Sequence, residues 1–424
     1  MNLQSCFNQK TRKRIGDEFI RHLSGGDAVF LQTCARCGLC ADSCHYYIAE
    51  ADPRNIPAYK LNLLFRAFKR LMRKSGVHCL EQETVNEWVE ILFGRCTLCG
   101  RCAVNCTMGI NIPRLIRTAR GALAAVGLVP DGLQSTVTTA LEKGNNMGIT
   151  KEDWLETVEW LEEELQDELN DPRASIPVDK KDCRLLYTIN PREAMFFPLS
   201  ISSAAKVFYA AGESWTFPSE NFDVTNYGLY SGNDRDAGEM SGRLTESLQK
   251  LNCRELILAE CGHGFNSNRW EAPEWLQKHC SFPVKSIIEV IADYIRQDRI
   301  RLDPEKNSKT VTLHDPCNLV RLGGIIEIQR LILSRSVKNF VEMIPNREKN
   351  FCCGGGGGQL AMTRFAKRRL QAGRIKAEQI RKTGAEIVVT PCHNCIDQLM
   401  ELNKHYKLNI EVKTITEMVA DALI

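Results

Sequence analysis

Thirteen of the 19 cysteines stand in three spacings that suit iron–sulfur clusters. Thiolates are soft, anionic ligands for iron, and short spacings allow several of them to reach one cluster. One spacing, C-x2-C-x2-C-x3-C, occurs twice and predicts two [4Fe–4S] cubane clusters. Its cysteines are Cys34, Cys37, Cys40 and Cys44 in the first copy, and Cys96, Cys99, Cys102 and Cys106 in the second.

In ferredoxins with two such motifs, the fourth cysteine of each motif binds the cluster of the other motif. The proline that usually follows this fourth cysteine is missing, and His45 and Thr107 take its place. Structural zinc is the alternative, but four-cysteine zinc sites use paired C-x2-C units rather than runs of this spacing. The expected ligand sets are Cys34, Cys37, Cys40 and Cys106 for one cubane, and Cys96, Cys99, Cys102 and Cys44 for the other.

The third set contains one thiol more than a cubane needs. Its members are Cys317, Cys352, Cys353, Cys392 and Cys395. Side chains of adjacent cysteines diverge, so the pair in this set indicates a cluster large enough to take both. The five glycines that follow the pair, with Gly354, Gly355 and Gly356 nearest, are expected to let the backbone approach and donate N–H groups. Phosphate binding is the alternative, but a P-loop requires Lys and Ser/Thr where Gln359 and Leu360 stand.

Composition narrows the class of protein. A chain of 424 residues predicts two or three domains, and a net charge of +3 gives no case for nucleic acid binding. The odd cysteine count, and the expected lack of a signal peptide, argue against a secreted disulfide scaffold. No apolar run reaches the length of a membrane span, and the nearest, residues 195–211, is interpreted as strand, turn and helix. We therefore expect a chain that is soluble by itself.

The pattern of residues changes along the chain. Residues 1–125 hold both cubane motifs and predict a helical, ferredoxin-like domain, and the acidic stretch 151–170 predicts a helix within a linker of residues 126–180. From residue 181, short apolar strands alternate with helices, which predicts parallel sheets. A weak repeat, in which a strand enters a cysteine turn at Cys261 and again at Cys392, predicts two similar halves, 181–303 and 304–424. The expected fold is α+β and multidomain, with a pseudo-duplicated α/β region.

Residues 56–74 predict an amphipathic helix with a basic face. The apolar side is formed by Leu61, Leu64, Phe65, Phe68, Leu71 and Met72, and the basic side by Lys60, Arg66, Lys69, Arg70, Arg73 and Lys74. A solvated face of a core helix is one interpretation. The other is a contact with anionic lipid or with the loops of a membrane partner.

A family resemblance follows from these motifs. The third set, C-x34-CCG-x37-CxxC, resembles the cysteine-rich CCG domain of heterodisulfide reductases. Two cubane motifs upstream in the same chain are similar to the fused, D-type subunits of these enzymes. The segments CCGGGGG and PCHNC resemble most the DsrK, HmcF and TmcB group, cytoplasmic iron–sulfur subunits of membrane redox complexes in sulfate reducers. The resemblance spans nearly the whole chain.

The resemblance implies that the five-cysteine set holds a noncubane [4Fe–4S] cluster with an open iron that can bind sulfur. It also implies two CCG halves that face each other across the reactive site. The first half departs from this pattern: Asp223-Val224-Thr225 stands where a second CCG is expected, and Cys261-Gly-His263-Gly keeps one cysteine of CxxC. We therefore expect only one noncubane cluster.

The resulting hypothesis is an electron-transfer subunit with a thiol-active site. Electrons would pass through both cubanes to the noncubane cluster, where a disulfide or trisulfide of a small thiol or carrier protein is reduced or formed. His314, His393 and His263 are candidate proton donors or, alternatively, hydrogen-bond partners of sulfides. Cys261 is expected either to react, with a thiol pKa lowered by a helix N-terminus, or to be a packed remnant.

Two other functions stay open. The iron–sulfur subunits of glycolate, lactate and glycerol-3-phosphate dehydrogenases also join cubane motifs to CCG domains, although they usually keep Cys-Pro after each motif. A pure electron relay without thiol chemistry is the second. Five cysteines fit no motif and are interpreted as small buried hydrophobes: Cys6, Cys79, Cys183, Cys253 and Cys280.

The resemblance implies partners as well. These are a cytochrome b-type membrane subunit that interacts with quinone, other redox subunits such as a multihaem cytochrome or a ferredoxin-like protein, and a carrier protein of the DsrC type. Anaerobic respiration with sulfate is the expected setting. We expect peripheral attachment to the cytoplasmic face of the membrane.

Overall fold

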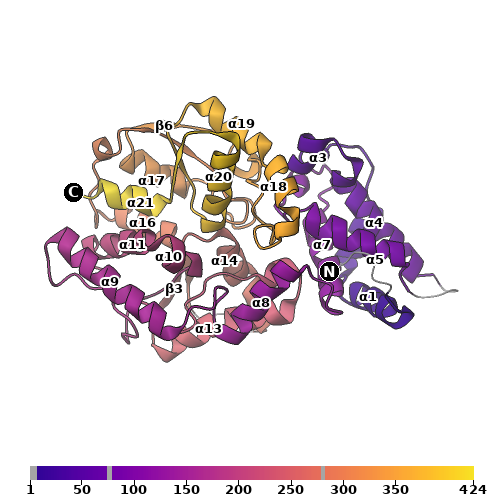
Figure 1. Ribbon diagram of the computed structural model, residues 1–424, viewed down its shortest axis with the longest axis horizontal. Helices are drawn as coiled ribbons and strands as arrows, with labels where there is room; N and C mark the ends of the chain where they lie inside the picture. The colour runs from indigo at the N-terminus through magenta and orange to yellow at the C-terminus, as the bar shows by residue number, and fades with distance from the viewer. Residues whose placement is uncertain (1–6, 74–78, 278–281) are drawn as a thin grey trace.

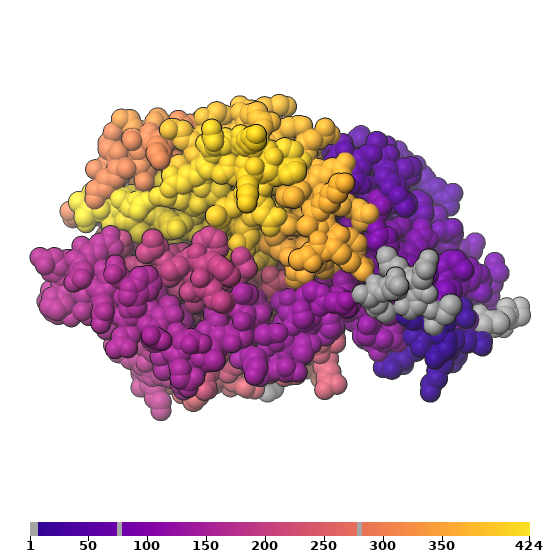
Figure 2. All heavy atoms as spheres, in the orientation of Figure 1, coloured from indigo at the N-terminus to yellow at the C-terminus, as the bar shows by residue number. Residues whose placement is uncertain are grey.

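The computed structural model describes residues 7–73, 79–277 and 282–424, so Cys6, Cys280 and Lys74 lie outside the described residues. Figure 1 shows the N-terminal helices (indigo) at one end of the molecule. The two α/β regions lie beside them, the earlier one (magenta) below the later one (orange to yellow). In Figure 2 the magenta and yellow segments meet along a long seam.

Each α/β region contains one four-stranded sheet in which all paired strands are parallel. The strand orders are β2-β1-β3-β4 and β6-β5-β7-β8, which is the same topology used twice. The prediction of a pseudo-duplicated α/β fold is confirmed. The bounds are β1 (Leu185–Thr188), β2 (Trp215–Thr216), β3 (Glu255–Leu258) and β4 (Val284–Ser286), then β5 (Thr310–Leu313), β6 (Asn339–Val341), β7 (Ile387–Val389) and β8 (Glu411–Lys413).

The two sheets share one apolar core, because helices from both halves pack between them. These helices are α11 (Pro198–Ala210), α16 (Ile287–Arg296), α17 (Ile328–Ser336) and α21 (Ile415–Ala422). Helix α9 (Lys151–Leu169) adds Trp154, Leu161 and Leu165 to the same core. The region between residues 126 and 180 is therefore in close contact with the first sheet, and the domain boundaries themselves stay a proposal.

The N-terminal region is helical around a second core. Its helices are α1 (Gln9–Arg21), α2 (Gly25–Gln32), α3 (His45–Glu50), α4 (Pro57–Leu71), α5 (Gln82–Trp88), α6 (Arg101–Val104) and α7 (Ile112–Ala124). The remaining helices that matter below are α8 (Asp131–Lys143), α10 (Pro191–Phe196), α12 (Gly228–Ser231), α13 (Asp234–Lys250), α14 (Gly262–Asn266), α15 (Ala272–Leu276), α18 (Ala366–Ala372), α19 (Arg374–Thr383) and α20 (His393–Tyr406).

Two local predictions are wrong. Residues 195–211 form no strand, because α10 and α11 meet at Pro198, which occupies the first turn of α11. In α4, Lys60 is buried and its ammonium donates to the Arg95 carbonyl, while Met72 is exposed beyond the helix end. Among the described residues, none of the helices is long and apolar enough to cross a membrane.

Candidate iron–sulfur centres

The two cubane motifs form loops with the same backbone conformation. In each, the residue before the second cysteine and the glycine after it have positive φ: Arg36 and Gly38 in the first, Leu98 and Gly100 in the second. Glycine tolerates this conformation and a larger residue is strained in it, so both loops are built to a common shape. In the second loop, the Leu98 amide donates to the Cys96 Sγ at 3.4 Å.

The thiols of these loops fall into two neighbourhoods. Burial raises the pKa of the Cys40 thiol, and nearby Cys34 and Cys106 raise it further. Burial also raises the pKa of Cys102 well above its usual value, with Cys99, Cys96 and Cys44 adding to the effect. Like charges act this way only over short distances. The structure thus brings the fourth cysteine of each motif to the other motif, and the crossed ligand sets built on this remain a prediction.

Four thiols of the second neighbourhood line one cavity. They are Cys44, Cys96, Cys99 and Cys102, and Ile112 and Ile116 are among the apolar side chains that share the wall. In the first neighbourhood, Cys37 is exposed at the surface and Cys40 is buried. A single apolar space surrounded by four thiols suits the donor set of a cubane.

The five remaining motif cysteines converge from three loops that follow β5, the short helix Arg347–Lys349 and β7. All five are buried. Contact with Cys317 lowers the pKa of Cys352, and contact with Cys352 and Cys395 lowers that of Cys353. The Sγ atoms of Cys353 and Cys395 are 3.4 Å apart, and contact with Cys395 lowers the pKa of Cys392 to about 7. The five thiols therefore form one continuous contact group.

The glycines after the cysteine pair bring backbone against sulfur and against neighbouring elements. The Gly354 amide donates to the Cys352 Sγ at 3.4 Å, and the Gly355 amide also donates to Cys353. A Cβ on Gly355 would lie 2.9 Å from the Cβ of Gln398 on α20. A Cβ on Gly357 would lie 2.6 Å from the Cα of Thr97 in the second cubane loop. The run therefore permits the close packing of the five-cysteine set onto the N-terminal region.

The second cubane loop touches the five-cysteine set directly. Contact with Cys352 is the largest influence that raises the pKa of the Cys99 thiol, followed by burial. Cys99 belongs to the cavity described above, and Cys352 to the group of five. The two thiol groups therefore meet without an intervening layer of side chains.

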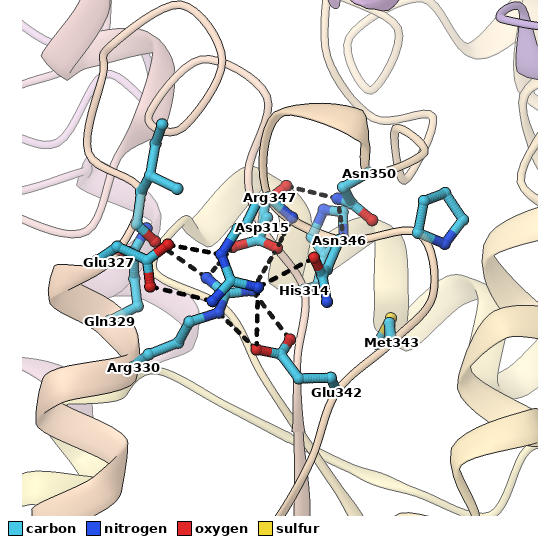
Figure 3. Close-up of polar contacts among 12 residues, drawn as sticks. His314, Asp315, Glu327, Gln329, Arg330, Glu342, Met343, Asn346, Arg347 and Asn350 are labelled. Atoms are coloured by element: carbon cyan, nitrogen blue, oxygen red, sulfur yellow. Dashed lines mark hydrogen bonds and ion pairs between the residues drawn. The ribbon is translucent and has the colours of Figure 1, made fainter.

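The loop that carries Cys317 is anchored by a buried carboxylate (Figure 3). Asp315 accepts two hydrogen bonds from Arg330, at 3.0 and 2.9 Å, and Arg330 also pairs with Glu342. The Arg347 amide donates to the same carboxylate at 2.7 Å. A bidentate arginine–carboxylate pair fixes orientation as well as position. The network thus holds the end of β5 where it presents Cys317.

A buried lysine lies behind the cysteine pair. The Lys376 ammonium donates to the Asn350 Oδ1 at 2.6 Å, and the Asn350 amide group lies 3.3 Å from the His314 Nδ1. Burial lowers the pKa of Lys376 to about 8, although Asp315 and then Cys353 act in the opposite direction. A cation at this depth offsets the charge of nearby thiolates. Lys376 cannot be predicted from the motifs, because it lies in an ordinary helical pattern that contains no cysteine.

The three histidines named as proton donors differ in charge. Burial lowers the pKa of His263 to about 3 and that of His314 well below its usual value, so both are neutral near pH 7. Burial also acts to lower the pKa of His393, but Glu193, whose Oε1 is 2.8 Å from the His393 Nε2, helps to raise it to about 9. His263 and His314 therefore fit the hydrogen-bonding alternative better than proton donation.

The cysteine turn of the first half faces the one of the second half. The Gly262 amide donates to the Cys392 Sγ at 3.4 Å, and the His393 amide donates to the Glu260 carbonyl at 2.9 Å. Of the two roles considered for Cys261, the reactive one calls for a lowered pKa, whereas burial raises the pKa of this thiol well above its usual value, and Cys392 adds to this. Helix α14 is a single short turn and does not outweigh the loss of solvation.

Tyrosines occupy the region where the family pattern predicts a second CCG. The ring of Tyr230 lies 5.2 Å from that of His263, and its hydroxyl accepts a 3.0 Å hydrogen bond from Asn318, next to Cys317. The Tyr227 ring is also 5.2 Å from His263. Aromatic side chains thus cover the five-cysteine set on this side.

Arg120 connects all three parts of the molecule and was also missed. It is fully buried, and burial lowers its pKa to about 10. Its guanidinium donates to the carbonyls of Leu92 and Cys96, of Tyr230, and of Gly357. Only the three-dimensional meeting of these loops gives Arg120 its role, so the sequence contains no signal for it.

A cleft of about 660 Å³ is lined in part by Asn318, which follows Cys317 in the chain. It lies between α1 and α7 on one side and α13, α15 and the turn before α15 on the other. Its walls carry Arg114, Arg117, Trp270 and Trp275, and its lining includes Tyr230 and Asn318. Asn318, the residue after Cys317, is thus the part of the lining that borders the five-cysteine set.

Comparison with known proteins agrees with this arrangement. Residues 30–110 match the 4Fe-4S dicluster domain, and residues 311–400 match a cysteine-rich domain of the CCG family. The chain is 27% identical to the Hdr-like menaquinol oxidoreductase iron-sulfur subunit of Archaeoglobus profundus, over 93% of this chain and 80% of that one. It is 28% identical to the D subunit of the dihydromethanophenazine:CoB–CoM heterodisulfide reductase of Methanosarcina mazei, over 95% and 96%.

A more distant relative is the EtfAB:quinone oxidoreductase of Syntrophomonas wolfei, 24% identical over 93% of this chain and 58% of that protein. The matched domains contain all three cysteine sets, and the buried thiols fit the iron–sulfur clusters that both domain types imply. The chain therefore contains matches to a 4Fe-4S dicluster domain and to a CCG domain, and over most of its length it is similar to the D subunits of heterodisulfide reductases.

Proposed function

We propose that the chain is the electron-transfer subunit of a membrane-associated, heterodisulfide reductase-like complex, and that its five-cysteine set is the site of thiol–disulfide chemistry. The meeting of Cys99 and Cys352, whose Sγ atoms lie within 4.8 Å of each other, is the observation that carries this proposal. Two cubanes and one noncubane [4Fe–4S] cluster, bound by the three thiol sets, would supply one-electron storage and transfer. The names of the relatives support an oxidoreductase.

The three thiol sets are arranged in an order that suits an electron path from the surface to the interior. Cys37 is exposed, and Leu39, Val104 and Met108 around the first cubane loops are each about half exposed. The thiols around the second cubane loop line a largely apolar cavity, and the five-cysteine set is buried. A redox partner would dock over Cys37, because electron transfer favours close approach to the most exposed thiol set.

The cleft suits a substrate that arrives as an extended group. Its volume of about 660 Å³ and its arginine and tryptophan side chains favour the arm of a sulfur-carrier protein over a bare small thiol. At its inner end, Tyr230 and Asn318 would orient the incoming sulfur beside Cys317. Lys376 would hold positive charge behind the cysteine pair while negative charge develops in front of it.

Attachment to the inner membrane face through a cytochrome b-type subunit is part of the same proposal. The candidate contact is the basic side of α4 together with the residues just after it, reduced to Arg66 and Lys69 on the helix and Arg73 beyond its end, all of which are exposed. Lys60 is buried and Arg70 pairs with Glu81, so neither is free for a partner. Charge reversal at the three exposed positions should release the chain from membranes at moderate salt, whereas unchanged attachment would make α4 ordinary scaffold.

Disulfide turnover tests the function. Anaerobically purified chain, with reduced viologen as donor and a peptide carrying a disulfide or trisulfide as substrate, should show turnover that Cys353→Ser lowers at least tenfold. Cys253→Ser is the matched control, since this cysteine is buried in the core outside every motif. Equal turnover in wild type and Cys353→Ser would contradict the proposal.

Electron relay without thiol chemistry is the second candidate. It is favoured by two relatives whose names refer to quinones rather than disulfides. Fully loaded protein that accepts electrons but reduces no disulfide would support it. The dehydrogenase alternative would instead require a flavin subunit that co-purifies with the chain.

A further inference from the structure

His45 stands where the cubane motif usually has proline, and the proposed function leaves it without a role. It is the first residue of α3 and is 2% exposed. Within the described part of the chain, its Nε2 has no hydrogen-bond partner. A buried N–H without a partner costs about 1–3 kcal/mol. A histidine at this position is therefore destabilising relative to proline, unless its N–H donates a hydrogen bond to a nearby acceptor.

The surroundings of His45 identify that acceptor. One ligand atom each from His45, Cys99 and Cys352 lie within 4.8 Å of one another. Cys99 belongs to the second cubane loop and Cys352 to the five-cysteine set, so the imidazole is located where the two thiol groups meet.

The position of His45 is also fixed from the other side. Cys44 and Tyr46, its neighbours in sequence, pack with Ala372 of α18 in a small buried cluster. Helix α3 is thus held against the second α/β half, and the imidazole between its neighbours has little freedom. Proline would fill the same first-turn position without a side-chain donor.

We propose that His45 is a positioning residue that donates an Nε2–H hydrogen bond to sulfur at the Cys99–Cys352 junction and thereby sets the relative reduction potentials of the two groups. The inference rests on the proposed electron path and names the residue that controls its last step. A hydrogen bond to sulfur favours the more reduced, more negative state and raises the potential. One polar side chain would then decide how readily an electron crosses between the groups.

Redox titration followed by EPR tests this with three variants. His45→Phe keeps a ring and removes the donor, His45→Pro restores the usual residue, and His45→Gln keeps an N–H. We expect the first two to lower the potential of the second cubane or of the five-cysteine group by about 59 mV, a tenfold change in a one-electron equilibrium. His45→Gln should stay near the wild-type value.

Thr107→Pro is the matched control, because Thr107 occupies the same motif position beside the first cubane and is exposed. It should leave both potentials unchanged. Unaltered potentials in His45→Phe with full iron content would overturn the inference, as would loss of the second cluster in every variant, which indicates a purely structural residue. The measured quantity is a reduction potential and does not depend on the substrate. If the wild type reduced no disulfide, the proposed thiol chemistry would be contradicted, whereas the role of His45 would still be decided by the potentials.

Discussion

At the scale of single residues, burial is the main force that shapes the chemistry. It lowers the pKa of His263 and raises that of Cys261, so that the neutral form of each side chain is favoured in the folded protein. It also leaves Lys376 with a pKa of about 8 behind the cysteine pair. None of these effects is visible in a sequence, because each depends on the depth of the side chain and on neighbours distant along the chain.

Asp223 carries the first prediction, which concerns pH. Its carboxylate accepts hydrogen bonds from the amides of Asn146 and Thr225, yet burial raises its pKa from 3.8 to about 7. The folded state therefore prefers the protonated acid. This stabilisation is complete below about pH 4 and is lost as pH rises through 7.

The variant Asp223→Asn should remove that dependence, a difference of about 4 kcal/mol at most between pH 4 and 8. Because cluster proteins often unfold irreversibly, the measurement is the apparent Tm at one scan rate. The wild type should lose Tm from pH 5 to 8 more steeply than the variant. Parallel curves would mean that Asp223 is charged in the folded protein.

At the scale of elements, the sequence predicts more of the fold than of the site. The strands at residues 185–188, 255–258, 310–313 and 387–389 and the helix α9 lie where apolar runs and periodicity predict them. The helix pair α10 and α11 escapes prediction because its apolar, serine-rich pattern is equally typical of a buried strand. From the glycine run, the sequence predicts only that the backbone can approach the sulfides. The packing of the run on Thr97 could not be predicted, because it is a contact between regions far apart in the chain.

The prediction for the packing of elements concerns Gly357, in the glycine run. With φ of +65° and Thr97 backbone 2.6 Å from an added Cβ, Gly357→Ala must separate the glycine run from the second cubane loop. Gly384→Ala is the matched control, because Gly384 has the same φ of +65° and no neighbour within 4 Å of the added atom. The control should cost about 1 kcal/mol from backbone strain alone.

We expect Gly357→Ala to lower the apparent Tm well beyond the control and to reduce retained iron. Thermal melts and iron analysis on the same anaerobic preparation give both values. If both substitutions had equal effects, the contact between the glycine run and the second cubane loop would contribute neither to the apparent Tm nor to iron retention.

At the scale of the whole molecule, the N-terminal region and both α/β halves meet around the junction between the second cubane motif and the five-cysteine set. The duplicated sheets share a core, the cysteine turns of both halves face each other, and the N-terminal loops pack against the glycine run. The cysteine spacings predict each set separately. They do not predict that Cys99 touches Cys352, because nothing in the chain between them encodes the packing of one region on the other.

Arg120 is predicted to hold this assembly together. Arg120→Met should leave carbonyls of Leu92, Cys96, Tyr230 and Gly357 without their donor, at about 1–3 kcal/mol for each buried group left unsatisfied. We expect proteolysis between the N-terminal region and the α/β halves to accelerate. Arg114→Met, on the same helix but exposed and paired with Asp27, is the control and should resist like the wild type.

Three separable thiol sets that bind iron are the basis of every function proposed for this chain. Iron, acid-labile sulfide and zinc analysis of anaerobically purified protein tests it directly, with Cys353→Ser measured beside the wild type. We predict about twelve iron atoms per wild-type chain, four for each cluster, and about eight in the variant, with matching sulfide. Stoichiometric zinc with little iron, or loss of all iron in Cys353→Ser, would contradict the account.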